Sequence, residues 1–381
     1  MGATSNRVIC RNEVFIEGVS VGQFESFTLK SGMRTLGTTA VLTLPLYSVI
    51  IDKMGNTRSA GRADARIRKP FKDVRVEICS EVDVYCWYEG FEKIHVFHGF
   101  IEHISEGFPS KLYLRDGTFI LRFGNITDAW DDSATLRRIV DDCIDVAQTG
   151  FATERKKRGF TREIAKLTYS TSEQNVQAVT TPISFDNFAS GRAPFEVIQY
   201  LMQLLVLYGG VDNENRVFIG AGVADSTRPV ITLDTRYNVI ERDITPVNGM
   251  FVDYDVKITG VLKNGKKYTA TGGFKNTRSA ESKSALNKTY GENFRGFCVL
   301  NTVDEIQAMA DRTLAMLKGT RNKGTITTLL YPKCQLLDHV NYNDTIFDIN
   351  DAKYYVIGYS FSADLRGFYQ TLEVTDKVFM L

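Results

Sequence analysis

The residues of this chain whose types and spacing could do chemistry gather in one short stretch, KIHVFHGFIEHIS at 93–105, which carries three of the four histidines. His95, His98 and His103 could be zinc ligands. An imidazole nitrogen binds zinc at a distance of about 2.0–2.1 Å. Side chains alternate between the two faces of a β-strand, so we expect His98 to point away from the other two. His95 and His103 would lie about 26 Å apart along the strand. The pattern therefore predicts a strand whose histidines share no metal ion.

Two patterns that are typical of nucleotide binding are incomplete. The stretch GVLKNGKK at 260–267 approaches a phosphate-binding loop, but Lys267 stands where that pattern requires Ser or Thr. Asn264–Gly265 lies between two strand-like runs, which predicts a hairpin with a type I′ turn. Gly220 and Gly222 form only a fragment of a dinucleotide-binding fingerprint, because STRP follows and no helix begins there.

Carboxylates cluster where a helix is expected to begin and on its outer face: Asp128, Asp131, Asp132, Asp141 and Asp142. Acids at such places favour the helix dipole or are solvated. A glycosidase needs two carboxylates that face each other across a cleft, and folding could still bring such a pair together. The run DNEN at 212–215 lacks the following glycine and the distant glutamate of a calcium loop, which favours a polar turn. We therefore predict no catalytic, cofactor-binding or metal-binding residue, and no cofactor.

The composition is that of a globular protein without a strong field of one charge. The chain has 381 residues, enough for two or three domains, and a formal net charge of +1. That charge gives no reason to expect nucleic acid or anionic lipid as a general partner. No apolar run reaches the roughly 18–20 residues of a membrane helix, and the first residues match neither a secretory signal nor, because of Asn6, a myristoylation site.

The six cysteines are widely spaced and include no C-x-x-C pair. We expect reduced thiols, as in a protein made in a cytosol. These are Cys10, Cys79, Cys86, Cys143, Cys298 and Cys334.

Short strands are expected over the first 125 residues. In KDVRVEICS, Val74, Val76 and Ile78 fall on one face of an expected strand. Asp116–Gly117 lies between two alternating runs, which is a hairpin signal. The polar, Arg-rich and Gly-rich segment within 41–73 predicts a long loop, either solvated or in contact with a partner or with phosphates.

Helices are expected at three places. One follows Ser133 as N-cap, with apolar residues at helical spacing as far as Ala147 and Gly150 after its end. The basic run that follows, ATERKKRGFTREIAKL, favours a solvated face. A second helix begins near Pro194 and is expected to stop at Gly209–Gly210. The third spans 302–318, with Thr302 and Glu305 as a capping box and Gly319 after it.

Strands return from about residue 228, so the order of elements predicts an α+β, β-dominated chain of two small β-barrel domains with a helix-containing region between them. We place the first β-barrel domain at 1–127, the helix-rich middle domain at 128–227 and the second β-barrel domain, which contains the helix at 302–318, at 228–381.

Four stretches, taken in order, carry a resemblance that spans nearly the whole chain. They are FESFTLKSGMRTLGTTAVLTLPL; VRVEI with FHGFIEHIS and LYLRDGTF; APFEVIQYLMQLLVLYGGVDNENRVFIG; and DEIQAMADRTLAMLKG with the strands that follow it. The sequence resembles the baseplate hub proteins of contractile phage tails: the Mu-like hub, the late control protein D family and the N-terminal part of type VI secretion spike proteins.

This resemblance implies a structural protein, not an enzyme. Three copies would form a ring, and their six barrels would join a six-fold tail tube to a three-fold central spike while DNA passes through. The implied partners are the tail tube protein, the central spike protein, the tape measure protein and other baseplate proteins, with no sequence-specific nucleic acid and no membrane anchor. The implied location is the virion tail, assembled in the host cytoplasm and used in cell puncturing. Two alternatives stay open: a cell-wall or glycan-degrading enzyme that uses Asp128 and Asp131, and a distal-tail or receptor-binding module of a non-contractile tail.

Overall fold

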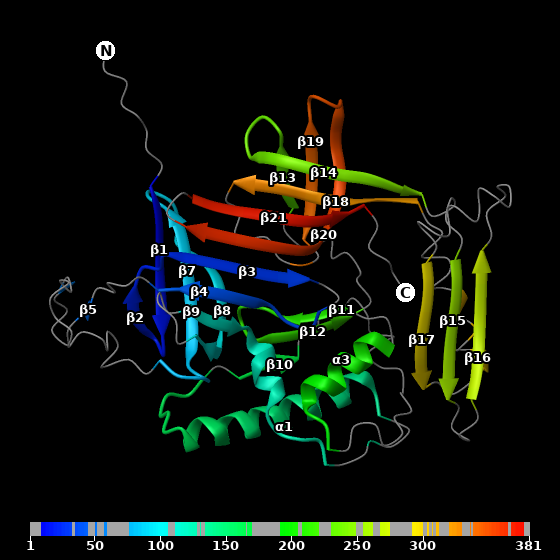
Figure 1. Ribbon diagram of the computed structural model, residues 1–381, viewed down its shortest axis with the longest axis horizontal. Coiled ribbons are helices and arrows are strands. Elements are labelled where there is room, and N and C mark those ends of the chain that lie inside the picture. Colours follow the sequence, from blue (N-terminus) through cyan, green and yellow to red (C-terminus); the bar gives the residue numbers. More distant parts are fainter. Residues whose placement is uncertain are drawn as a thin grey trace.

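The structure is a computed structural model, and it describes most of the chain. The described residues are 9–32, 35–44, 50–51, 57–58, 76–105, 111–127, 130, 134–164, 166–169, 191–204, 208–220, 230–248, 254–261, 267–274, 292–299, 303–304, 307, 310–311, 320–329, 336, 338–364 and 367–376. One large sheet dominates it, and the two long helices lie together along one side of that sheet (Figure 1). No helix within the described ranges is long and apolar enough to cross a membrane.

The large sheet has 13 strands in the order β14-β18-β21-β20-β3-β4-β9-β8-β7-β1-β2, and β19 joins it at β20 and carries β13. Its strands are β1 (Cys10–Ile16), β2 (Val19–Gly22), β3 (Ser26–Gly32), β4 (Thr39–Thr43), β7 (Glu81–Tyr88), β8 (Ile94–Ile104), β9 (Lys111–Arg115), β13 (Val230–Asp234), β14 (Val239–Asn248), β18 (Thr320–Leu329), β19 (His339–Asp344), β20 (Ile349–Asp364) and β21 (Gly367–Thr375). The N-terminal and C-terminal strands therefore belong to one sheet.

The junction between the two groups of strands is the antiparallel pair β3–β20. It runs from Ser26 opposite Asp364 to Gly32 opposite Gly358. The prediction of a β-dominated α+β chain is confirmed. The prediction of two closed small barrels is wrong for the described strands, because β3 uses its free edge to pair with β20 and the sheet stays open.

Three smaller sheets complete the strands. They are β5 (Ile50–Ile51) with β6 (Thr57–Arg58), β10 (Thr168–Tyr169) with β11 (Tyr208–Val211) and β12 (Arg216–Gly220), and β15 (Tyr254–Val261) with β16 (Lys267–Phe274) and β17 (Glu292–Val299). Strands β15 and β16 pair antiparallel up to Val261 opposite Lys267. This pairing confirms the predicted hairpin, and its turn at Asn264–Gly265 lies outside the described residues.

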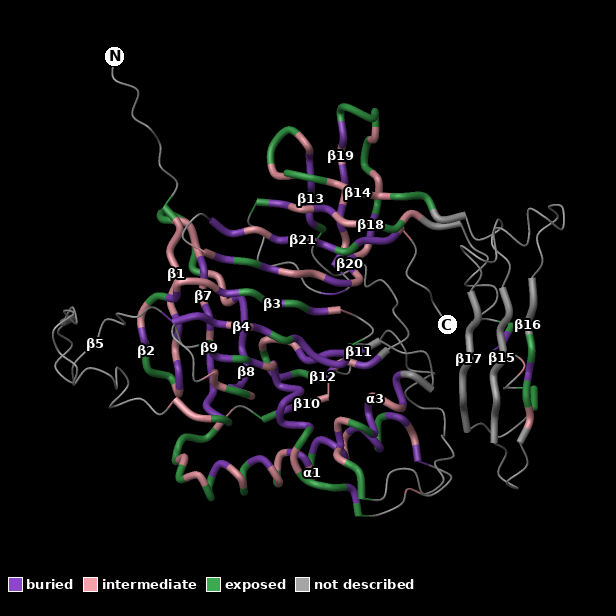
Figure 2. Tube along the Cα trace, viewed as in Figure 1, coloured by how far each residue is buried: buried purple, intermediate pink, exposed green. Residues whose placement is uncertain are grey.

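Buried side chains form three main hydrophobic cores, and the buried positions run along the strands and the inner sides of the helices (Figure 2). The N-terminal strands bury Phe27 and Phe97 together with Phe361 and Phe368 of the C-terminal strands. The second core gathers Leu233, Tyr342, Val356 and Leu372 with other residues of β13 to β21. The third core packs the helices against β8 and the segment after β9. The first core thus crosses the β3–β20 junction. The cores do not test the predicted domain boundaries, and those boundaries stay a prediction.

Helix α1 (Leu136–Lys157) has the predicted apolar stripe but different ends. Its N-cap is Thr135, whose hydroxyl accepts a hydrogen bond from Arg138 N at 3.3 Å, so the prediction of Ser133 as N-cap is wrong. Gly150 does not end the helix. A Cβ at Gly150 would lie 2.6 Å from Gly124 N, so this glycine serves a close approach between backbones. The first part of the basic run, as far as Lys157, continues α1.

The second helix is α3 (Pro194–Leu204), which begins at Pro194 as predicted. It ends before Gly209–Gly210, which belong to strand β11 and pair with Phe218 and Ile219 of β12. Within the expected third helix at 302–318, the described residues Val303, Asp304, Gln307, Ala310 and Asp311 are helical. The capping box of Thr302 and Glu305 lies outside the described residues, as does Gly319.

Two strand signals in the first part of the chain failed. Residues 76–80, the described end of the predicted strand KDVRVEICS, form a turn instead. Asp116–Gly117 is no hairpin turn: the Asp116 carboxylate accepts hydrogen bonds from Thr118 N and Thr38 N and caps the 3-10 helix η2 (Gly117–Arg122). An Asp that can satisfy the free N–H groups of a helix start competes with its use in a hairpin.

Gly99 of β8 lies close to the backbone of the neighbouring strand β9. A Cβ there would lie 2.2 Å from the Arg115 carbonyl oxygen, which is part of the backbone and cannot move aside. We expect Gly99→Ala to lower the free energy of unfolding by about 1–3 kcal/mol, as overpacking does. Urea unfolding measures this. Gly32→Ala is the control, because its Cβ would meet Thr35 Oγ1 at an ordinary 3.6 Å. Equal losses in both variants would contradict the close approach.

Candidate functional site

The histidine-bearing stretch forms strand β8, which pairs antiparallel with β7. The register moves from Val84 opposite Phe97 to Tyr85 opposite His95, so Val96 is an extra residue in β8. An extra residue of this kind, a β-bulge, interrupts the alternation of side chains. His95 and His98 therefore lie on the same side of the hairpin, and the prediction that they point apart is wrong.

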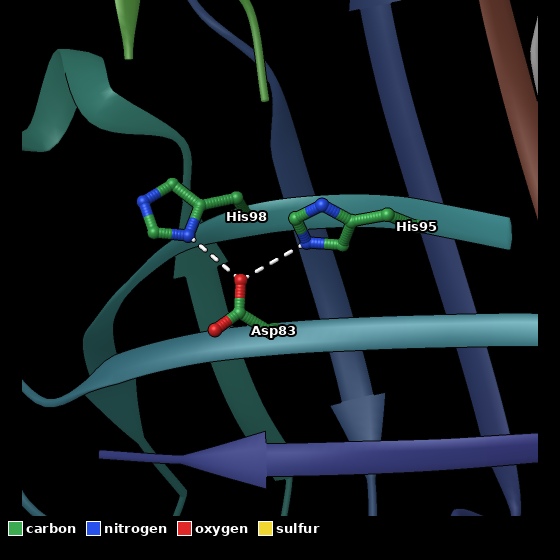
Figure 3. Close-up of side chains that lie close together, drawn as sticks. All are labelled: Asp83, His95 and His98. Atoms are coloured by element: carbon green, nitrogen blue, oxygen red, sulfur yellow. Dashed lines mark hydrogen bonds and ion pairs between the residues drawn. The ribbon is translucent and has the colours of Figure 1, made fainter. Parts of the chain in front are cut away.

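Both imidazoles meet the carboxylate of Asp83, which lies on β7 (Figure 3). Asp83 Oδ1 accepts hydrogen bonds from His95 Nε2 at 3.0 Å and from His98 Nδ1 at 2.8 Å. His103 lies farther along β8 and packs against the ring of Tyr113. The fourth histidine, His339, packs against Tyr355 in the C-terminal strands. The structure thus brings together two of the three histidines, and adds an aspartate that the sequence did not single out.

Burial and hydrogen bonding act against each other on the pKa values of this cluster. Burial alone raises the pKa of Asp83, but the hydrogen bonds from His95 and His98 outweigh it and hold that pKa well below its usual range. Burial alone lowers the pKa of His98, and the hydrogen bond to Asp83 with nearby carboxylates outweighs it, so the pKa is raised. Asp83 is therefore ionised in the folded protein at neutral pH.

Neighbouring groups hold the two imidazole rings in place. The ring of Tyr85 stacks on His95 with centroids 4.6 Å apart. His98 Nε2 lies 3.0 Å from Asn215 Nδ2 and 3.9 Å from Glu81 Oε1. Asn215 belongs to the turn between β11 and β12, so the cluster links the large sheet to a smaller one.

A buried ion pair lies beside this cluster. Arg155 of α1, which is 3% exposed, donates from Nη1 and Nη2 to the two carboxylate oxygens of Glu17 at 2.9 Å each. Arg155 Nη1 also donates to the Cys79 carbonyl at 2.6 Å, and Glu17 Oε1 accepts from Glu81 N at 2.7 Å. Glu81 in turn pairs with Arg162 at 2.9 Å. The expectation of a solvated face is therefore wrong for Arg155, which fastens the end of α1 to the turn between β1 and β2.

The other candidates from the sequence have structural roles where they are described. Asp142 accepts a hydrogen bond from Trp130 Nε1 at 2.7 Å, and Asp141 pairs with Arg137 at 3.7 Å. Asp128, Asp131 and Asp132 lie outside the described residues. In the run DNEN, Asp212 accepts from Glu214 N and Arg216 N, which makes the polar turn that we expected.

The remaining chemical signals are accounted for in the same way. Gly220 is the last residue of β12, and Gly222 lies outside the described residues. Lys267 begins β16, so a strand stands where a phosphate-binding loop needs a helix. Cys10, Cys79, Cys86 and Cys143 are free thiols.

The fold is that of known tail proteins. No protein-family model matches the sequence, and no curated protein matches it. Among solved structures, it is similar to the tail protein from Neisseria meningitidis MC58, with a TM-score of 0.59 and 14% identity over 98% of each chain. It is also similar to the 43 kDa tail protein of prophage MuSo2 from Shewanella oneidensis, with a TM-score of 0.55 and 13% identity over 96% of each chain. The resemblance seen in the sequence is thus confirmed at the level of the fold.

The Arg155–Glu17 pair gives a stability test. Arg155→Ala leaves the Glu17 carboxylate without its buried partner, so we expect the free energy of unfolding to fall by about 3–5 kcal/mol. The matched control is Arg158→Ala at the C-cap of the same helix, which breaks an i,i+4 pair with Glu154 at 2.7 Å at the surface. That loss should stay under about 1 kcal/mol. Urea unfolding of both variants measures the difference. Similar losses of unfolding free energy would show that the buried pair contributes no more to stability than the surface pair.

Proposed function

We propose that this chain is the structural hub of a phage tail baseplate, a homotrimer whose ring joins the six-fold tail tube to the three-fold central spike and lets DNA pass. The observation that carries the proposal is the likeness of the whole fold to the two tail proteins, together with the order of sequence motifs that resembles the hub family. The role is mechanical, and it needs no catalytic residue.

The continuous sheet supports this role. Each copy has an N-terminal and a C-terminal group of strands, and the backbone hydrogen bonds of β3 and β20 join them into one sheet. A joined sheet transmits force between its two halves without a flexible linker. Three copies would present six such groups, which answers a mismatch between six-fold and three-fold neighbours. In this proposal the domains are 1–127, 128–227 and 228–381, and rings built from repeated head-to-tail contacts are a normal closed assembly.

The proposed partners are other parts of a contractile tail: the tail tube protein, the central spike protein, the tape measure protein and further baseplate proteins. The proposed place is the virion tail, after assembly in the host cytoplasm, where the hub takes part in cell puncturing. The net charge of +1 gives the chain no strong general attraction that would hold passing DNA. The proposal includes neither an enzymatic activity nor a membrane anchor.

An exposed apolar set offers a contact surface for such an assembly. Strands β13 and β19 pair in parallel, so the turns that follow them lie at the same edge of the sheet. Tyr237 on one turn and Ile346 and Phe347 on the other are 76%, 80% and 63% exposed. We call these three residues the apolar tip. Asp344 accepts hydrogen bonds from the backbone N–H groups of Ile346 and Phe347, and these bonds define the conformation of the second turn.

Exposed apolar residues gathered at one place mark contacts with other molecules more often than isolated ones do. We assign the apolar tip to a neighbouring copy of this chain in the ring. In the free chain these side chains contact water, and their burial between copies would stabilise the ring.

The mass of the purified chain in solution tests the proposal. We expect a species of about three times 42.8 kDa by light scattering, and a ring with a central hole by negative-stain imaging. A stable monomer at concentrations well above those used for imaging, or a monomer that degrades cell-wall material, would overturn the hub assignment.

A paired variant tests the contact surface separately. Ile346→Asp with Phe347→Asp should shift the trimer toward monomer, whereas Phe91→Asp, at a residue 74% exposed on the turn between β7 and β8, should leave the mass unchanged. A trimer that withstands the double substitution would show that the apolar tip does not form the contact between copies.

A further inference from the structure

We propose that Asp83, His95 and His98 form a binding site for a divalent transition-metal ion, with zinc as the ion to test. Among the residues that the structure describes, these are the three His, Cys, Asp or Glu side chains whose ligand atoms all lie within 4.8 Å of one another. Two imidazole nitrogens and one carboxylate oxygen suit zinc and its neighbours, whereas calcium and magnesium prefer oxygen ligands alone. The site is independent of the proposed hub role.

The present distances are close to those that an ion would require. Two ligands at about 2.1 Å from a tetrahedral zinc ion lie roughly 3.4 Å apart. Asp83 Oδ1 lies 3.0 Å from His95 Nε2 and 2.8 Å from His98 Nδ1. Separating Asp83 Oδ1 from each nitrogen by about half an ångström makes room for the ion, and rotation of the Asp83 side chain provides that movement. The two ligand nitrogens lie within 4.8 Å of one another, so the imidazole rings must also adjust to reach a common ion.

The backbone places the ligands in advance. Asp83 lies in β7, and both histidines lie in the neighbouring strand, on either side of the extra residue Val96. Without that bulge, His95 and His98 would point to opposite faces, and only one of them would reach Asp83. Ligands on paired strands are held more precisely than ligands on loops.

The cluster is open on one side and supported on the other. The side chains of His95 and Asp83 are 30% and 19% exposed, whereas His98 is 8% exposed. An ion can therefore enter beside His95, and the fourth position of a tetrahedral site faces solvent there. A site with three protein ligands and one open position is a known arrangement for zinc.

The surroundings of His98 fit a ligand role. When Nδ1 binds an ion, the imidazole proton resides on Nε2, and it then needs an acceptor. Asn215 Nδ2 lies 3.0 Å from Nε2 and is itself a donor, so the Asn215 amide must rotate by about 180° to present its oxygen to this proton. Glu81 Oε1, 3.9 Å from Nε2, is a second acceptor after a shift of about 1 Å. Histidine ligands usually donate from their other nitrogen to a carboxylate or carbonyl, which fixes the ring. The Asp83 carboxylate supplies the negative charge that a divalent cation favours.

The experiment uses the full chain, purified without a histidine tag and treated with a chelator that is then removed. Zinc chloride is titrated by calorimetry, and thermal unfolding is followed with and without zinc. We expect one zinc ion per chain and a higher Tm, because an ion that binds only the folded state stabilises it. Cobalt chloride as a second probe should give the absorption of a site with nitrogen and oxygen ligands, without a sulfur-to-cobalt charge-transfer band.

Three variants decide the assignment. His95→Gln and Asp83→Asn should weaken zinc binding by at least about 100-fold, since losing a ligand costs more than losing the partner of a ligand. His103→Gln removes a histidine of the same strand outside the cluster and should bind zinc as the unaltered chain does. His95→Gln keeps the test valid if Asp83→Asn does not fold, because His95 is partly exposed.

The proposal is overturned by any of three results. These are a chain that binds no zinc, a His95→Gln variant that binds zinc as tightly as the unaltered chain, and a cobalt spectrum with a thiolate band, which would place the ion at a cysteine. In each case the cluster is a hydrogen-bonded link between β7 and β8 and nothing more.

Discussion

The position of the helices on the sheet depends on one desolvated charge, the guanidinium of Arg155. A buried charge is costly unless it is paired and hydrogen-bonded. Among the residues that the structure describes, the Glu17 carboxylate and the Cys79 and Arg162 carbonyls accept hydrogen bonds from this guanidinium. Because the guanidinium must form all of these hydrogen bonds, they fix the position of the end of α1 relative to the sheet. Phe151 lies one turn earlier on the same helix face, and the centroid of its ring is 5.0 Å from that of Phe100. The helical core and the polar cluster on β7 and β8 therefore share one anchor.

The parts of the fold that local patterns encode were predicted from the sequence. Pro194 begins α3, the apolar stripe of α1 is buried, and the hairpin of β15 and β16 forms where Asn264–Gly265 indicated. Each of these signals depends on residues within a few positions of one another, which is why a single sequence reveals them.

The features that were missed depend on partners far away in the chain. Asp116 caps η2 and also accepts from Thr38, which is 78 positions earlier. The bulge at Val96 changes the side to which His95 points, and nothing in the composition of β8 reveals an extra residue. Asp83 belongs to another strand, so a search for close histidines could not include it. A bulge is visible only when the partner strand and its register are known.

The pairing of β3 with β20 has a consequence for the synthesis of the chain. Because β3 ends at Gly32 and β20 begins at Ile349, roughly 320 residues must be synthesised before the partner exists, which takes on the order of 16–60 s at about 5–20 residues per second. During that interval one edge of β3 presents unpaired backbone groups on a nascent chain, and such edges recruit strands from other molecules. Polysomes place several nascent copies side by side. Protecting this edge until translation ends is therefore a requirement for producing the protein in quantity.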